Sequence, residues 1–141
     1  MLQDPFAEWP DSRLVEPVRG EERLANVRQL TFGGQNAEAY WSPDGAKIVF
    51  QSRQPGFPDE QIFVMNADGS GKRLISTGKG RTTCGFFSPD GKWIYFSSTH
   101  ATNEGAQAAL DMSKGYFWMV NPEFALYRTP ADTDGSGSRF Q

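Results

Sequence analysis

The stretch Tyr40-Trp41-Ser42-Pro43-Asp44-Gly45 returns as Phe86-Phe87-Ser88-Pro89-Asp90-Gly91, with every position moved by 46 residues (from 42 to 88). At the same spacing each copy continues into Ile-x-Phe-x-Ser, at residues 48–52 and 94–98. Proline presets φ at the first central position of a β-turn, aspartate accepts bonds from the backbone beyond it, and glycine tolerates a positive φ. The flanking aromatic and β-branched runs are too short for helices, so each copy is predicted to be a β-hairpin.

A second hairpin follows the first. Residues 61–65 are predicted to be a strand, residues 66–71 (Asn-Ala-Asp-Gly-Ser-Gly) a turn, and residues 72–76 the next strand. A partial echo occupies residues 124–129, followed by Asp132-Thr133-Asp134-Gly135-Ser136-Gly137. Asp-Gly between two apolar runs is among the stronger short-range hairpin signals, so both segments are interpreted as hairpins.

Aspartate in these turns has a second interpretation, as a metal or ligand contact. Asp44 and Asp90 stand where the turn itself favours aspartate, so we interpret both as turn residues. Asp132-x-Asp134-Gly135 matches the first part of a calcium loop, but the later ligand positions of such a loop are missing. We therefore expect no metal site and no cofactor.

Two hairpins in each repeat of this length give four strands, which is typical of a β-propeller blade. The fold class predicted is all-β, with blades of four antiparallel strands, about two blades, and an incomplete propeller. The expected strands are residues 37–41, 47–52, 61–66 and 72–76 in blade one (37–76), and 82–87, 93–98 and 124–129 in blade two (82–141). Residues 27–31 are predicted to be an isolated outer strand, and residues 1–26 a loosely ordered acidic leader before the blades at 27–141.

Composition excludes several classes of function. The net charge is −3, whereas a nucleic-acid partner requires clustered lysine and arginine. No apolar run reaches the ~20 residues that span a bilayer, and residues 1–5 lack the basic and apolar regions of a signal peptide. Cys84 is the single cysteine, which excludes an internal disulfide and a multi-cysteine zinc site. It lies in the expected inner strand of blade two, where we predict a buried, inert thiol.

The two Ser-Pro-Asp-Gly hairpins, together with the stretch Ile-Phe-Val-Met-Asn-Ala-Asp-Gly-Ser-Gly-Lys-Arg-Leu (62–74) that follows the first of them, closely resemble the repeat of TolB-like β-propellers. The resemblance covers residues 27–141. It implies a protein-binding or gating platform, with six blades in the best-known members, in a periplasmic or exported protein. Similar blades occur in the propeller domains of prolyl-oligopeptidase-type peptidases.

The chain departs from that family pattern in three respects. It holds about two blades rather than six. It shows no signal peptide, which leaves a cytoplasmic location as the alternative. In the last expected strand, Pro130 cannot donate to a ladder, so we expect this strand to be short or bulged.

The link between the second and third strands of blade two, residues 100–123, is three times as long as its counterpart at 53–60 (24 residues against eight). Structureless links beyond ~12–15 residues are uncommon and often functional. In an up-and-down blade, alternate connections lie on one face, which places this insert beside the loops that carry Arg53 and Arg81. The candidate ligand-binding residues are Arg53, Arg81, His100 and Trp118. The alternative is that the insert is a structural cover, with its run at 116–120 packed over the blade.

No residue is predicted to be catalytic, because neither a Gly-x-Ser-x-Gly elbow nor a His-Glu-x-x-His motif is present. The function predicted is therefore a non-catalytic module that binds a protein or peptide, in a chain that we expect to be a fragment of a larger exported TolB-like protein. One alternative is the N-terminal propeller part of a peptidase that lacks its catalytic domain. The other is a self-assembling structural propeller, which implies a homo-oligomer. No membrane span is expected.

Overall fold

The computed structural model describes residues 5–113, 115–116 and 120–133. In this part of the chain every regular element is a strand. The strands are β1 Arg13–Leu14, β2 Arg28–Gln29, β3 Gln35–Trp41, β4 Lys47–Arg53, β5 Gln61–Asn66, β6 Arg73–Leu74, β7 Thr82–Phe87, β8 Trp93–Ser98 and β9 Ala125–Pro130. The all-β prediction is confirmed.

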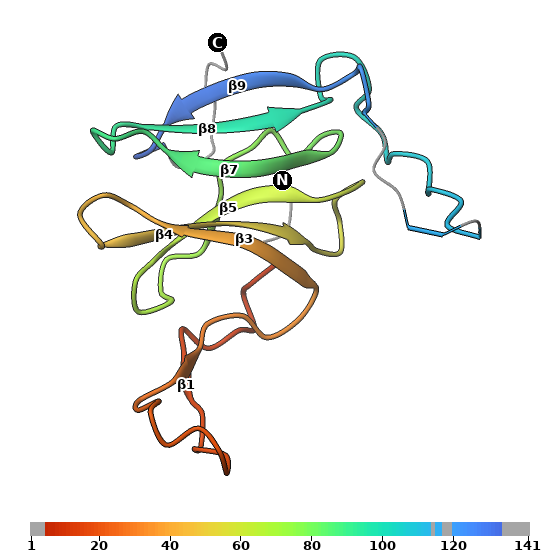
Figure 1. Cartoon of the computed structure of the whole chain (residues 1–141). Coiled ribbons are helices and arrows are strands. Elements are labelled where there is room, and N and C mark those ends of the chain that lie inside the picture. The colour runs from red at the N-terminus through yellow and green to blue at the C-terminus, as the bar shows by residue number, and fades with distance from the viewer. Residues whose placement is uncertain (1–4, 114, 117–119, 134–141) are drawn as a thin grey trace.

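The strands form two successive antiparallel blades that lie one above the other (Figure 1). Blade one has the order β3-β4-β5-β6, and blade two, within the described residues, has the order β7-β8-β9. The predicted strands of both blades agree with these elements to within a few residues. The prediction of an incomplete propeller of about two blades is thus confirmed.

Both Ser-Pro-Asp-Gly segments form the same turn. Asp44 Oδ1 accepts from Ser42 Oγ over 2.6 Å and from the Ala46 N–H over 3.0 Å. In blade two, Asp90 Oδ1 accepts from Ser88 Oγ over 2.5 Å and from the Lys92 N–H over 3.1 Å. These bonds to the charged form lower the pKa of both carboxyls. The interpretation of Asp44 and Asp90 as turn residues is confirmed.

The inner strands of the two blades share a β-bulge. In β3 the register shifts between Ala37 and Tyr40, and in β7 it shifts between Thr83 and Phe86. Within these two bulges, Glu38 and Cys84 have a positive φ, of 52° and 57° respectively. A bulge turns one side chain out of the alternation, so Cys84 is exposed. The prediction of a buried Cys84 is therefore wrong.

The main core lies between the blades and follows the period-two alternation of the strands. Blade one contributes Val49 and Ile62, and blade two contributes Ile94 and Phe96, all with 0% of their surface exposed. Gly85 allows the sheets to come this close, because a Cβ there would lie 2.8 Å from Ile62 Cγ2.

The opposite face of blade one is covered by the chain's own N-terminal segment. Ile48, Phe50, Phe63 and Met65 line this face, and Phe6 is buried against it with 5% exposure. The sequence predicts a loosely ordered leader over 1–26. An aromatic residue in it nevertheless stabilises the fold when buried, because each aromatic side chain removes ~150–250 Å² of surface from water. Part of the leader thus belongs to the core.

Two expectations about individual strands need correction. Within residues 27–31, β2 pairs with β1 and not with the edge of a blade, because the leader supplies a nearer partner. The strand containing Pro130 is neither short nor bulged: β9 has 6 residues and runs in continuous register from Ser98↔Ala125 to Trp93↔Pro130. Pro130 is the last residue of β9, where a missing N–H costs the ladder little.

Candidate functional site

The described residues of blade two's insert (100–113, 115–116 and 120–123) project from the end of the blades opposite the Ser-Pro-Asp-Gly turns, beside β9 (Figure 1). Arg53 ends β4 and Arg81 directly precedes β7, while His100 follows β8. Trp118, the fourth residue predicted for the site, lies outside the described residues. Alternate strand connections therefore bring the other three to the same end of the molecule, as their positions in the sequence predict.

Two ion pairs lie at this end of blade one, and the pair made by Arg81 connects it to the start of blade two. Arg81 Nε donates to Glu60 Oε2 over 2.8 Å, and Arg53 Nη2 lies 3.3 Å from Asp59 Oδ1. The arginine side chains remain 39% and 49% exposed, respectively. Each guanidinium group therefore keeps surface that a partner can contact from solvent.

Asp59 is a buried residue of blade one that helps to hold the insert in place. Its residue surface is only 3% exposed, and its Oδ2 accepts from the backbone N–H of Gln107 over 3.2 Å. The other oxygen, Oδ1, accepts from the Glu60 N–H over 2.9 Å. A buried carboxylate in a loop is a strong constraint, because leaving it without these bonds would be costly.

The insert closes on itself just beyond this anchor. Asn121 Nδ2 donates to Gln107 Oε1 over 2.7 Å, which forms a neck between the two ends of the insert. Closer to the blade, Thr102 Oγ1 donates to the Glu123 carbonyl over 3.2 Å, and Asn103 Nδ2 donates to Glu123 Oε2 over 3.3 Å. The described residues beyond the neck, 108–113, 115–116 and 120, thus belong to a loop with a fixed base.

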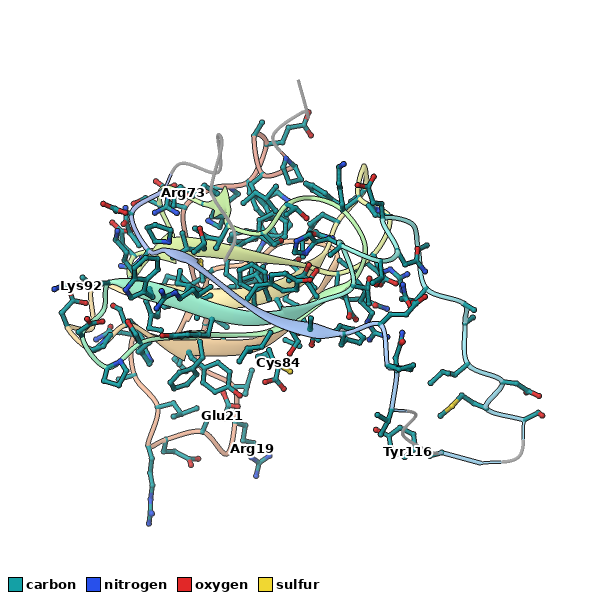
Figure 2. All side chains as sticks on the ribbon, turned by 90° about the horizontal axis from the view of Figure 1, so that it is seen from above. Arg19, Glu21, Arg73, Cys84, Lys92 and Tyr116 are labelled. Carbon is teal, nitrogen blue, oxygen red and sulfur yellow. The ribbon has the colours of Figure 1, made fainter. Side chains whose placement is uncertain are left out.

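Apolar side chains in this loop are exposed. Tyr116 is 78% exposed and Val120 is 91% exposed, and Figure 2 shows Tyr116 far out from the sheets. Leu110 and Met112 are 38% and 40% exposed. The cover hypothesis requires the run at 116–120 to be buried, and it is wrong for Tyr116 and Val120. Sequence reasoning did not single out Leu110 and Met112, although both lie in the long insert.

His100 lies at the base of the insert, next to β9. Its Nδ1 is 2.8 Å from Ser98 Oγ, and its ring centroid is 4.3 Å from that of Tyr127. Partial burial lowers the pKa of His100, so the neutral imidazole is favoured. Ser98 has no exposed surface, and its Oγ also lies 2.9 Å from Thr82 Oγ1. A substrate therefore cannot reach Ser98, and the contact between Ser98 and His100 serves to hold the histidine ring in place.

The opposite end of the blades contains a cleft of about 520 Å³ between the two Ser-Pro-Asp-Gly turns. Phe87 and Ala131 line it together with Lys47 and Lys92, and Lys92 extends outward from that end in Figure 2. Its carboxylates include Asp44 and Asp90, which the turns already use. The cleft therefore follows from turn packing.

Over the described residues, no group of three histidine, cysteine, aspartate or glutamate side chains is arranged to hold a metal ion. The same residues include no helix of the length and apolarity that a membrane span requires.

Comparisons with known proteins agree with the fold. No family model matches the chain. An uncharacterised protein of Agrobacterium fabrum is 36% identical over 61 residues, which cover 42% of this chain and 20% of that protein. A solved structure from Agrobacterium tumefaciens, described as a candidate TolB, has a TM-score of 0.55 and 25% identity, and it covers 82% of this chain. The chain spans 37% of that structure. These likenesses, with the two blades, support a TolB-like propeller fold.

Proposed function

We propose that this chain is a non-catalytic propeller module that binds a protein or peptide through the insert and its base. The site comprises the described residues of the insert beyond its neck (108–113, 115–116 and 120), with Arg53, Arg81 and His100 at the same end of the blades. Trp118, predicted from the sequence, lies in the insert's sequence but outside the described residues. The observation that carries the proposal is a loop fixed at its neck by Gln107 and Asn121, with Tyr116 and Val120 exposed beyond it.

Several exposed apolar side chains on one loop with an ordered base offer surface that a binding partner could bury, which supports the proposal. Aromatic and arginine residues carry much of the energy of protein interfaces. A segment with apolar side chains flanked by acidic groups would match this surface, because the apolar groups would contact the loop and the acidic groups would approach Arg53 and Arg81. TolB-like blades are expected to serve such a role in an exported protein, and cell fractionation would test that location.

Selection from a phage-displayed library of random dodecapeptides tests the proposal directly. Peptides selected on the wild-type protein should bind at least roughly tenfold more weakly to the triple variant Arg81→Gln, His100→Ala, Trp118→Ala, because ~1.4 kcal/mol of lost contact corresponds to that factor. The control is Arg19→Gln combined with Leu24→Ala, two changes in the exposed lobe around β1 and β2.

Circular dichroism must show that both variants remain folded. The proposal fails if no peptide is selected, or if the triple variant binds as tightly as the wild type. It also fails if the triple substitution unfolds the protein, because the insert base is then a structural element. The control variant should bind the selected peptides like the wild type.

A further inference from the structure

Equivalent positions in the two blades show which face of each sheet receives a neighbour. The 46-residue offset (94 minus 48) relates Ile48 to Ile94 and Phe50 to Phe96. Ile94 and Phe96 pack against blade one, in the core between the sheets. By the same logic, Ile48 and Phe50 lie on the face of blade one that would receive a preceding blade. We call this surface the acceptor face, made of Ile48, Phe50, Phe63 and Met65.

The chain's own residues 5–9, here called the plug, occupy the acceptor face. The Phe6 ring lies 4.9 Å from the ring of Phe63 and 6.1 Å from that of Phe50, measured between centroids. Trp9 in turn lies edge-on to Phe6, with centroids 4.9 Å apart. These two aromatic side chains, together with Leu30 and Phe57, which pack against the same cluster, fill a place where the repeat predicts a whole sheet.

The plug is attached differently from a blade. Residues 5–9 form a turn, in which the Trp9 N–H donates to the Phe6 carbonyl over 2.8 Å, and they join no sheet. Its anchor is the next segment, where Lys72 Nζ donates to the Asp11 carbonyl over 3.1 Å. Removing the plug from the acceptor face therefore breaks side-chain contacts but no strand pairing.

Blade two has one face toward blade one and one face away from it. The face away from blade one is equivalent, by the repeat, to the face of blade one that packs in the core. The register Val49↔Val64 and Gln51↔Ile62 in blade one corresponds to Tyr95↔Arg128 and Ser97↔Leu126 in blade two. We call this surface the donor face. Its four members are Trp93, Tyr95, Leu126 and Arg128.

Over the described residues, the donor face is partly exposed and of mixed character. Leu126 is 72% exposed, whereas its blade-one counterpart Ile62 is fully buried. The Arg128 guanidinium stacks over the Trp93 ring, 4.3 Å from its centroid. An apolar, aromatic and arginine surface of this kind resembles the centre of a protein interface more than a solvated sheet.

We propose that the acceptor face is a docking surface for a second copy of this chain, which presents its donor face, and that the plug closes this surface. The interface between the chain's own blades is the template for the contact, since it joins the same two kinds of face in the same order. The contact is heterologous, so one copy's acceptor face and the other copy's donor face remain available for further copies. The plug limits association by lowering the fraction of molecules whose acceptor face is open.

The test compares the wild type with Phe6→Ala combined with Trp9→Ala, by sedimentation velocity over a range of protein concentrations. The variant should associate at a concentration at least roughly tenfold lower, because its acceptor face is open in a larger fraction of molecules. Adding Leu126→Asp to this variant should return it to a monomer. The matched control, Leu24→Asp in the same background, should not, since Leu24 is similarly exposed (54%) but lies in the leader. A synthetic peptide of residues 1–12 should also restore the monomer.

The proposal is overturned if the variant is folded and monomeric at every concentration, or if Leu126→Asp leaves its association unchanged. If the variant loses its structure at low concentration, the proposal predicts that its circular dichroism recovers as the concentration rises, because a second copy then covers the open acceptor face. Loss of structure that is independent of concentration overturns the proposal.

Discussion

The backbone N–H of Gln107 donates to the carboxylate of Asp59 across 3.2 Å, which joins the insert of blade two to a loop of blade one. Asp59 is nearly enclosed, and Arg53 is its ion-pair partner at 3.3 Å. One buried side chain thus serves the packing of two blades and also sets the position of the insert. The base of the candidate site and the stability of the fold are therefore coupled at this residue.

Replacing Asp59 with alanine should release the insert and destabilise the fold. Bonds to a charged group contribute about 1.5–3 kcal/mol each, and partial access of water to the vacated site reduces the loss, so we expect roughly 1–3 kcal/mol. Urea denaturation measures the loss, and limited proteolysis should cut residues 100–123 faster. Asp111→Ala is the control, since Asp111 is an exposed residue of the insert whose carboxylate caps only a local turn at Ser113. If the two variants were cut by protease at the same rate, Asp59 would not anchor the insert.

Gly85 sets the distance between the blades, and Gly85→Ala should weaken their packing. The added Cβ would lie 2.8 Å from Ile62 Cγ2 and 3.1 Å from Val49 Cγ2. Both neighbours are β-branched and stiff, so overpacking should cost ~1–3 kcal/mol, against ~0.4–1 kcal/mol gained from the less flexible unfolded chain. We expect a net loss of about 1–2 kcal/mol in a chemical denaturation series.

The matched control for this change is Gly105→Ala. There the nearest atom to the new Cβ is Asn103 Oδ1, at 3.5 Å, which is ordinary contact. This variant should be neutral or slightly stabilised. A Gly85→Ala variant as stable as Gly105→Ala would show that the blades can move apart without cost.

The Ser-Pro-Asp-Gly turns should make the fold sensitive to acid. Hydrogen bonds from Ser42 and from Ser88 lower the pKa of Asp44 and of Asp90 in the folded protein. A carboxyl with a lowered folded pKa stabilises the fold above the unfolded pKa, near 4, and this contribution is lost as the pH falls through the folded pKa. Thermal melts of the wild type and of Asp44→Ala combined with Asp90→Ala should therefore differ most at neutral pH and converge as the pH falls below about 4.

The control for the pH series is Glu16→Ala, an exposed acidic residue of the leader. Its melting curve should follow that of the wild type across the whole series. If the double variant keeps the same deficit at low pH as at neutral pH, the turns do not depend on the charge of these carboxylates.

The hairpins of this fold could be predicted because their cause is local. Asp44 and Ser42 bond to each other within a single turn, so four consecutive residues decide the geometry. The alternation of the strands could be predicted for the same reason, because neighbours such as Ile48 and Val49 must face opposite sides of a sheet. The common position of Arg53 and Arg81 followed from the order of the connections.

The plug and the anchor of the insert depend instead on contacts between distant residues. Phe6 lies in a proline-containing leader with no periodicity, and nothing in that segment indicates that its ring meets Phe63. Asp59 reads as a polar loop residue, whereas its burial depends on Gln107 in the next blade. Contacts between such distant residues are made when the blades pack. A repeat pattern predicts these contacts only for the residues that belong to the repeat.

Cys84 provides the last prediction. A glycine inside a strand often marks a bulge, and Gly85 is such a signal beside Cys84, whose φ is 57° and whose side chain is exposed. A thiol reagent such as Ellman's reagent should therefore modify Cys84 in the folded protein, without denaturant. Non-glycine residues pay roughly 1–2 kcal/mol at positive φ, so Cys84→Gly should be tolerated, while the β-branched Cys84→Val should be destabilised by a similar amount. Labelling that begins only in denaturant, or a valine variant as stable as the glycine variant, would show that β7 continues through Cys84 without a bulge.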